Sequence, residues 1–307
     1  MPNHAFTSIL FPVDFSPMNN VTAPYVRDLA VATGASVTLL HVVPWLSGWY
    51  GAAELRPAVG GDQTLQDLHN RQMLALEMFR ERYFSHLRCF RLVKEGAVAE
   101  TIVDTTRQIQ SDLIMMPTRG LGSSRRFLIG STTAKVLHDA QCAVWTTPHL
   151  DPLRRFTGFR HMLCAVDRNE VPPDFLKEMV RLARCFESKL SFVTAIPSVI
   201  GGMGEERKIR SLDEEFPQAH LRDHIGCDLD CKVYLETGLI ADVVRRLVEK
   251  EAVDLVAIHR GHLQHPFGKL RTHTYEIVLE SPCPVLSLYV TAQHPLETAE
   301  YASLQTA

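Results

Sequence analysis

Three residues late in the first half of the chain have the types and spacing of a phosphate-binding loop. Gly120 is followed by nine residues, LGSSRRFLI, and then by Gly130 and Ser131, which open a stretch of helical periodicity. Glycine lets backbone approach a ligand closely, and the amides and dipole of a helix start favour negative charge. The Ser131 hydroxyl adds one hydrogen-bond donor. The same spacing is also typical of a simple turn, so its position in the fold decides its meaning.

Around this loop, short apolar runs alternate with longer helical stretches, which indicates parallel strands joined by helical crossovers. Strands are predicted near Ser8–Val13, Val37–Val42, Arg91–Lys94, Leu113–Met116 and Ala143–Thr146. The first helix is predicted to begin at Ser16, the N-cap before Pro17, and to end at Gly34, with a kink at Pro24. Further helices are predicted over Leu65–Phe84, Ala99–Gln110 and Ser131–Ala140. Open parallel sheets bind ligands where the strand order reverses. Asp14, after the first strand, and the Pro117–Ser131 loop, after the fourth, are therefore the candidate site.

The two halves of the chain repeat each other. SDLIMMPTRGLGSSRRFLIGSTTAKVLHDAQCAVW matches VDLVAIHRGHLQHPFGKLRTHTYEIVLESPCPVL, with Gly120 on Gly261 and Cys142 on Cys283, both pairs 141 residues apart. SILFPVDFS likewise matches HMLCAVDRN, which places Asp14 on Asp167. We therefore predict two α/β domains, 1–150 and 156–290, joined by DPLRRFTG and followed by a loose tail, 291–307.

Composition restricts the class of protein. The 307 residues are 46% hydrophobic and 22% charged, with a net charge of −3 and no basic stripe, which argues against disorder and against nucleic-acid binding. The N-terminus resembles no secretion signal and no apolar run is long enough to span a bilayer, so we expect no membrane association and a cytoplasmic location. The seven cysteines are expected to be reduced and mostly buried.

Four motifs together resemble the universal stress protein domain: ILFPVDFS in the first strand, HVV ending the second, EG before the third helix, and before the fourth a loop that matches the family's G-x2-G-x9-G-[S/T] except at its first residue. The resemblance covers nearly all of residues 1–148 and, more weakly, 156–290. It implies the adenine nucleotide alpha hydrolase-like fold in each domain, a five-stranded parallel sheet with helices on both faces. In this family one subset binds ATP, and other members bind no nucleotide.

Carried over to this chain, the resemblance places Asp14 and the backbone of Val42 against adenine, and Gly120, Gly130 and Ser131 against ribose and phosphates. Pro117 stands where the family's loop begins with glycine, and it offers no backbone N–H. Arg119, with Arg125 and Arg126, can supply phosphate contacts instead, although such loop arginines are usually solvated.

The second half has lost most of this pattern. Pro117, Gly120, Gly130 and Ser131 are matched there by Ile258, Gly261, Arg271 and Thr272, so we expect a closed site, with Asp167 capping the next helix instead. His220, His224, Cys227 and Cys231 lie close in sequence and are residue types that can coordinate zinc, and the histidine-rich loop 259–273 offers similar metal ligands. Buried cysteine and solvated histidine are the favoured interpretations, so no metal is predicted.

The sequence thus predicts a stress-response or regulatory protein that binds an adenine nucleotide such as ATP in its first domain. No catalytic motif is present, so an enzyme is not expected. The rival is a ligand-free structural or protein-interaction module, and slow ATP hydrolysis is a third alternative. The two domains are expected to form an intramolecular pseudo-dimer through the strands CAVWTT and CPVLSLYV, with an unknown protein partner and a homodimer as further possibilities.

Overall fold

The computed structural model describes residues 5–44, 61–120, 129–148, 158–166, 171–196, 231–260 and 270–289, with the side chains of 61–65 and 270–273 left aside. Several of the residues singled out above lie outside these ranges: linker residues 151–157, Arg125, Arg126, Asp167, Gly261, His220, His224, Cys227 and the tail. Among the described helices, none combines the length and apolar character needed to cross a bilayer. The described residues also hold no group of three or more His, Cys, Asp or Glu side chains arranged for a metal ion.

The first half alternates strands and helices as predicted, with boundaries that differ by a few residues. In chain order its elements are β1 (Ser8–Pro12), α1 (Pro17–Thr33), β2 (Ser36–Pro44), α2 (Gly61–Phe84), β3 (Cys89–Gly96), α3 (Val98–Gln108), β4 (Leu113–Pro117), α4 (Ser131–Asp139) and β5 (Ala143–Thr147). The second half contains β6 (His161–Ala165), α5 (Pro173–Cys185), β7 (Lys189–Ile196), β8 (Lys232–Thr237), α8 (Ile240–Lys250), β9 (Leu255–Arg260), α9 (Leu270–Glu280) and β10 (Val285–Tyr289).

The limits of α1 follow from its local sequence. Ser16 is the N-cap residue in extended conformation, and Pro17 occupies the first turn, where its missing N–H costs no intrahelical bond. Gly34 ends the helix at φ 72°, in the left-handed region that glycine adopts without strain. Both predicted ends of the helix are confirmed. Pro24 lies inside the helix, and a bend there stays a prediction.

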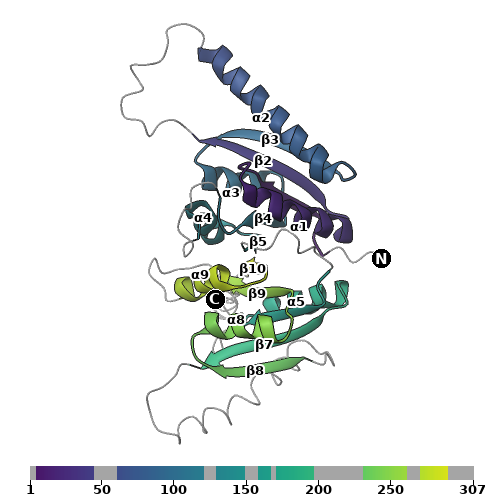
Figure 1. Ribbon diagram of the computed structural model, residues 1–307, viewed down its shortest axis with the longest axis vertical. Coiled ribbons are helices and arrows are strands. Elements are labelled where there is room, and N and C mark those ends of the chain that lie inside the picture. The colour runs from purple at the N-terminus through teal and green to yellow at the C-terminus, as the bar shows by residue number, and fades with distance from the viewer. Residues whose placement is uncertain are drawn as a thin grey trace, which may run out of the picture.

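The described strands form one continuous sheet of ten, in the order β3-β2-β1-β4-β5-β10-β9-β6-β7-β8. Figure 1 shows the two halves meeting at β5 and β10. Within each half the pairs are parallel, as predicted, and the halves join where β10 runs antiparallel to β5. The expected contact between the two last strands is therefore confirmed. Its centre is the pair Trp145 and Leu286, which are equivalent positions in the repeat. This register is what a pseudo-twofold axis between the two halves produces.

Helices cover both faces of this sheet, and each face has its own hydrophobic core running through both halves. One core combines side chains of α1, α2 and α5, including Leu29, Phe79 and Phe175. The other combines side chains of α3, α4, α8 and α9, including Ile102, Leu137 and Val278. The predicted doubly covered parallel sheet is thus confirmed, and no break separates the two halves at the level of the core.

The strand register corrects one detail of the repeat. Leu113 pairs with Ile9, and Leu255 pairs with Met162, which is the counterpart of Ile9. Counting along each strand from these pairs, Pro117 corresponds to His259, so the match of Pro117 with Ile258 is wrong by one residue. The first half has one extra residue between this strand and the glycine of the loop.

Candidate nucleotide site

The candidate site lies where the strand order of the first half reverses. From β1 the chain moves to β2 and β3 on one side, and then returns to β4 and β5 on the other. Asp14 follows the carboxyl end of β1, and Gly120 follows that of β4. The reversal leaves the carboxyl ends of β1 and β4 adjacent, with their outgoing loops turned to different faces.

The structure brings Asp14 and Gly120 into contact. A Cβ atom on Gly120 would lie 2.3 Å from Oδ2 of Asp14, far inside any van der Waals distance. The space that glycine leaves empty is therefore occupied by the carboxylate. Glycine is therefore needed at position 120, but the group that comes close to its backbone is the Asp14 carboxylate and not a ligand.

The loop after β1 holds the Asp14 carboxylate in place. Oδ1 of Asp14 accepts a hydrogen bond from the Ser16 amide (2.9 Å), and the Asp14 amide donates to Oδ1 of Asn19 (2.8 Å). Asn19 is buried and also donates through Nδ2 to the Pro12 carbonyl (3.3 Å). Between them Phe15 adopts φ 59°, an uncommon conformation for a non-glycine residue. These bonds direct Oδ2 toward Gly120.

Val42 lies beside this loop on β2. The last β1–β2 pair joins Pro12 and Leu40, and the Leu40 carbonyl accepts the Val13 amide at 2.8 Å. Val42 lies two residues after Leu40, so its backbone N–H and C=O groups also point toward the β1 side of β2, but beyond the end of β1. Its side chain is buried in the core below. The backbone of Val42 thus faces the edge where Asp14 lies.

Sequence reasoning missed His41, which anchors the same region. Its Nδ1–H donates to the Val13 carbonyl at 2.7 Å, and its ring lies 4.8 Å from that of Phe15 between centroids. It missed Asn19 as well. Nothing in the spacing of either residue predicts its role, because both act on loop backbone that only the folded chain brings near.

The two ends of the glycine loop meet at the carboxyl end of β4. The Thr118 amide donates to the Thr147 carbonyl on β5, and the Thr118 carbonyl accepts the Gly130 amide, both at 3.0 Å. The Thr133 hydroxyl donates to the Pro117 carbonyl at 3.1 Å. The first turn of α4 is thereby fixed to the end of β4, next to Gly120.

At Gly130 and Ser131 the structure differs from the expectation in that the Gly130 amide bonds the protein itself. Because the Gly130 amide already donates to Thr118, the donors that α4 presents outward are the amides of its first turn and the exposed Ser131 hydroxyl. A Cβ atom on Gly130 would make only ordinary contacts of 3.5 to 3.6 Å, so close approach does not require glycine there. The first turn of α4 holds no acidic residue and has no side-chain cap, which suits an anion.

The remaining predicted residues frame the site. Pro117 is the buried last residue of β4, so its missing N–H belongs to a strand end. Arg119 is partly buried, and its Cα lies 3.6 Å from the position of a Cβ on Gly130. In the second half, His259 packs on Phe175 with ring centroids 5.7 Å apart, so its ring lies against α5.

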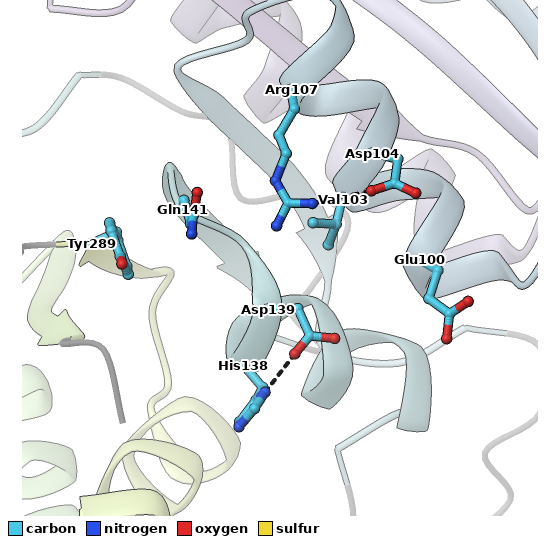
Figure 2. A pocket seen from close by; sticks show the side chains of 8 residues that line it. All are labelled: Glu100, Val103, Asp104, Arg107, His138, Asp139, Gln141 and Tyr289. Carbon is cyan, nitrogen blue, oxygen red and sulfur yellow. Dashed lines mark hydrogen bonds and ion pairs between the residues drawn. The ribbon is translucent and has the colours of Figure 1, made fainter. Parts of the chain in front are cut away.

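A separate cavity of about 380 Å³ lies at the other end of α4 (Figure 2). Its lining residues are Glu100, Val103, Asp104, Arg107, His138, Asp139, Gln141 and Tyr289. Each of its carboxylates has a cationic or imidazole partner: Glu100 bonds Lys135 at 2.6 Å, Asp104 bonds Arg107 at 3.1 Å, and Asp139 bonds His138 at 2.5 Å. The cavity shares no residue with the site around Asp14.

Comparisons with known proteins agree with this architecture. The family model described as "Universal stress protein family" matches residues 5–148 and 158–288. A universal stress protein of Synechocystis sp. is 30% identical over 146 residues, 47% of this chain and 86% of that protein, and one of Thermus aquaticus is 28% identical over 142 residues, 45% and 96%. The crystal structure of a universal stress protein from Archaeoglobus fulgidus has a TM-score of 0.68 at 15% identity, covering 95% of this chain and 99% of that one. With two tandem matches that span most of its length, the chain belongs to the universal stress protein family.

Proposed function

We propose that the first domain binds an adenine nucleotide, ATP, at the reversal point between β1 and β4, and that the protein acts as a stress-response or regulatory protein through this ligand. One observation carries the proposal: the Asp14 carboxylate, the Gly120 backbone and the start of α4 lie together at this edge of the sheet. Both a polar anchor for a base and donors for phosphate are therefore present.

The roles follow from the geometry. The Asp14 carboxylate and the β1-facing backbone of Val42 offer acceptor and donor groups for adenine. The amides of the first turn of α4 and the Ser131 hydroxyl offer donors for phosphate. Gly120 leaves the space in which the Asp14 carboxylate lies. Arg119 adds a positive charge at the loop's first residues.

The test is titration of the full chain with ATP, ADP and AMP by calorimetry, after any nucleotide that copurifies has been released and identified by chromatography. We expect ATP to bind and Asp14→Ala to weaken it at least about tenfold, a loss typical of a charge-assisted hydrogen bond. The matched control is Asp174→Ala, because Asp174 is an exposed carboxylate in the first turn of α5, the counterpart of α1.

Two outcomes contradict the proposal. Absence of heat with millimolar nucleotide favours the ligand-free interaction module instead. Equal losses in the Asp14 and Asp174 variants place the nucleotide elsewhere. Release of inorganic phosphate above background supports the ATPase alternative.

A further inference from the structure

Arg260, in the second domain, reaches across the pseudo-twofold axis to the helix that carries the candidate phosphate donors. It is the last residue of β9 and only 8% exposed. Its Nη1 donates to the carbonyls of Leu137 (2.6 Å) and Ala140 (2.9 Å), and its Nη2 donates to that of Cys142 (2.6 Å). All three acceptors belong to the last turn of α4 or to the residues just after it.

This arrangement matches the electrostatics of a helix end. The last carbonyls of a helix have no intrahelical donor and carry a partial negative charge, which a cation stabilises. The planar guanidinium donates to several carbonyls at once, which the single ammonium of lysine does less well. The Tyr289 ring lies 5.9 Å from the guanidinium carbon and adds a cation–π contact.

A second group from the same domain holds the middle of α4. The Tyr275 hydroxyl on α9 donates to the carbonyl of Ala134 at 3.0 Å. The first domain holds the beginning of the helix, through the Gly130 amide and the Thr133 hydroxyl. The helix has nine residues, is about 13 Å long and moves as one rigid unit. The first domain thus hydrogen-bonds the beginning of the helix, and the second domain hydrogen-bonds its middle and its last turn.

We propose that Arg260 is a positioning residue for the nucleotide site of the first domain: by capping the last turn of α4, it sets where the first turn of the same helix presents its amides to phosphate. The proposal rests on the proposed function of that site. It assigns the second domain a defined task, since its own loop has lost the glycine pattern. Nucleotide affinity in one domain then depends on the contact between the two.

The first measurement is ATP affinity in the full chain with Arg260→Met, which keeps the aliphatic stem and removes the donors. We expect affinity to fall about tenfold, within the usual range of coupling between sites. Arg260→Lys should recover part of the loss, because lysine restores the positive charge but not the planar guanidinium that donates to several carbonyls. The matched control is Arg245→Met, since Arg245 is an exposed arginine of the same domain paired with Asp242.

The second measurement needs no nucleotide. Hydrogen exchange of the Gly130 and Ala134 amides reports the start of α4, because these amides donate to Thr118 and Gly130 respectively. In the ligand-free protein, we expect Arg260→Met to accelerate both about tenfold, as loosening of the whole helix requires. A role limited to local packing would change exchange only around the last turn.

The outcomes separate the two proposals. If the unmodified protein binds no ATP, the proposed function is wrong, and exchange at Gly130 and Ala134 alone decides the role of Arg260. If Arg260→Met fails to fold, Tyr275→Phe replaces it, with an expected loss of about threefold for one neutral hydrogen bond. Unchanged exchange at the start of α4, or ATP affinity within twofold of the unmodified protein, overturns the positioning role.

Discussion

The Asp14 carboxylate occupies the space that a side chain on Gly120 would need, with Oδ2 2.3 Å from the position of its Cβ. The contact joins the loops after β1 and β4 at the reversal point of the sheet. It also means that the two residues are coupled, because an added methyl group at position 120 must displace Oδ2 of the carboxylate whose other oxygen accepts the Ser16 amide.

Gly120→Ala should therefore destabilise the protein, by up to about 1 kcal/mol, because the Asp14 carboxylate at the end of its side chain must move aside. Combined with Asp14→Ala, which empties that space, the substitution should cost less than the sum of the two single changes. Urea unfolding of the four proteins measures this coupling. Additive free energies of unfolding would show that the carboxylate does not fill the space beside Gly120.

Ser131→Pro should weaken ATP binding by about tenfold or more, because it removes both the hydroxyl and the amide that face the ligand. Stability should change by less than about 0.5 kcal/mol, since proline suits the first position of a helix. The preceding Gly130, at φ −59° and ψ 139°, already has the extended conformation that a following proline requires.

Ser131→Ala serves as the paired control for that change, because it removes the hydroxyl alone. Calorimetric titration should give a smaller loss than for the proline variant, because one donor to the phosphate is removed instead of two. The difference between the two variants measures the amide. Equal affinities for the proline and alanine variants would place the phosphates away from the start of α4.

Pro117→Ala should leave ATP affinity within about threefold. Pro117 is the buried end of β4, and the group that it contributes to the loop is its carbonyl, which accepts the Thr133 hydroxyl. Alanine keeps that carbonyl and only adds an N–H at the strand end. A much larger gain in affinity, measured by the same titration, would mean that the missing amide had limited phosphate binding.

Stability should fall as the pH rises from about 9 to 11, in part through Cys142. Burial raises the pKa of its thiol from 9.0 to about 11, despite the opposing influence of the nearby Arg260 charge. Over this window the unfolded chain releases the thiol proton and the folded chain keeps it, so the free energy of unfolding decreases with pH. The loss is on the order of 2 kcal/mol at the upper end.

Cys142→Ala should remove that part of the alkaline loss while it keeps the backbone carbonyl that accepts Arg260. Thermal midpoints measured between pH 8 and pH 11 give the comparison. Cys89, whose pKa burial raises to about 12, contributes separately and stays in both proteins. Parallel curves for the unmodified and variant proteins would show that the Cys142 thiol is not protected in the folded state.

Local signals predicted most of the fold. The Ser16–Pro17 start and the Gly34 end of α1 depend only on neighbouring residues, so the sequence was sufficient to locate them. The alternation of strands and helices predicted the parallel sheet, and the apolar runs CAVWTT and CPVLSLYV predicted the contact between the last strands. Asp14 and Gly120 could be placed together because the reversal of strand order is a property of topology.

What the sequence could not predict depends on contacts between distant segments. Asn19 and His41 anchor loop backbone through single hydrogen bonds, and no residue spacing signals such a bond. The Gly130 amide was expected to face a phosphate, but the Thr118 carbonyl takes it. The role of Arg260 could not be predicted from the sequence either, because the carbonyls that it bonds lie more than a hundred residues earlier in the chain.

Trp145 and Leu286 face each other at the centre of the β5–β10 pair, although the repeat makes them the same position. In a dimer of identical chains, the residue on the twofold axis meets its own copy, so a bulky side chain there must pack against an equally bulky one. Fusion into one chain removes that constraint and lets a large indole meet a smaller leucine. Covalent duplication thus allowed the two sides of the axis to diverge in size and charge, and with them the duties of the two domains.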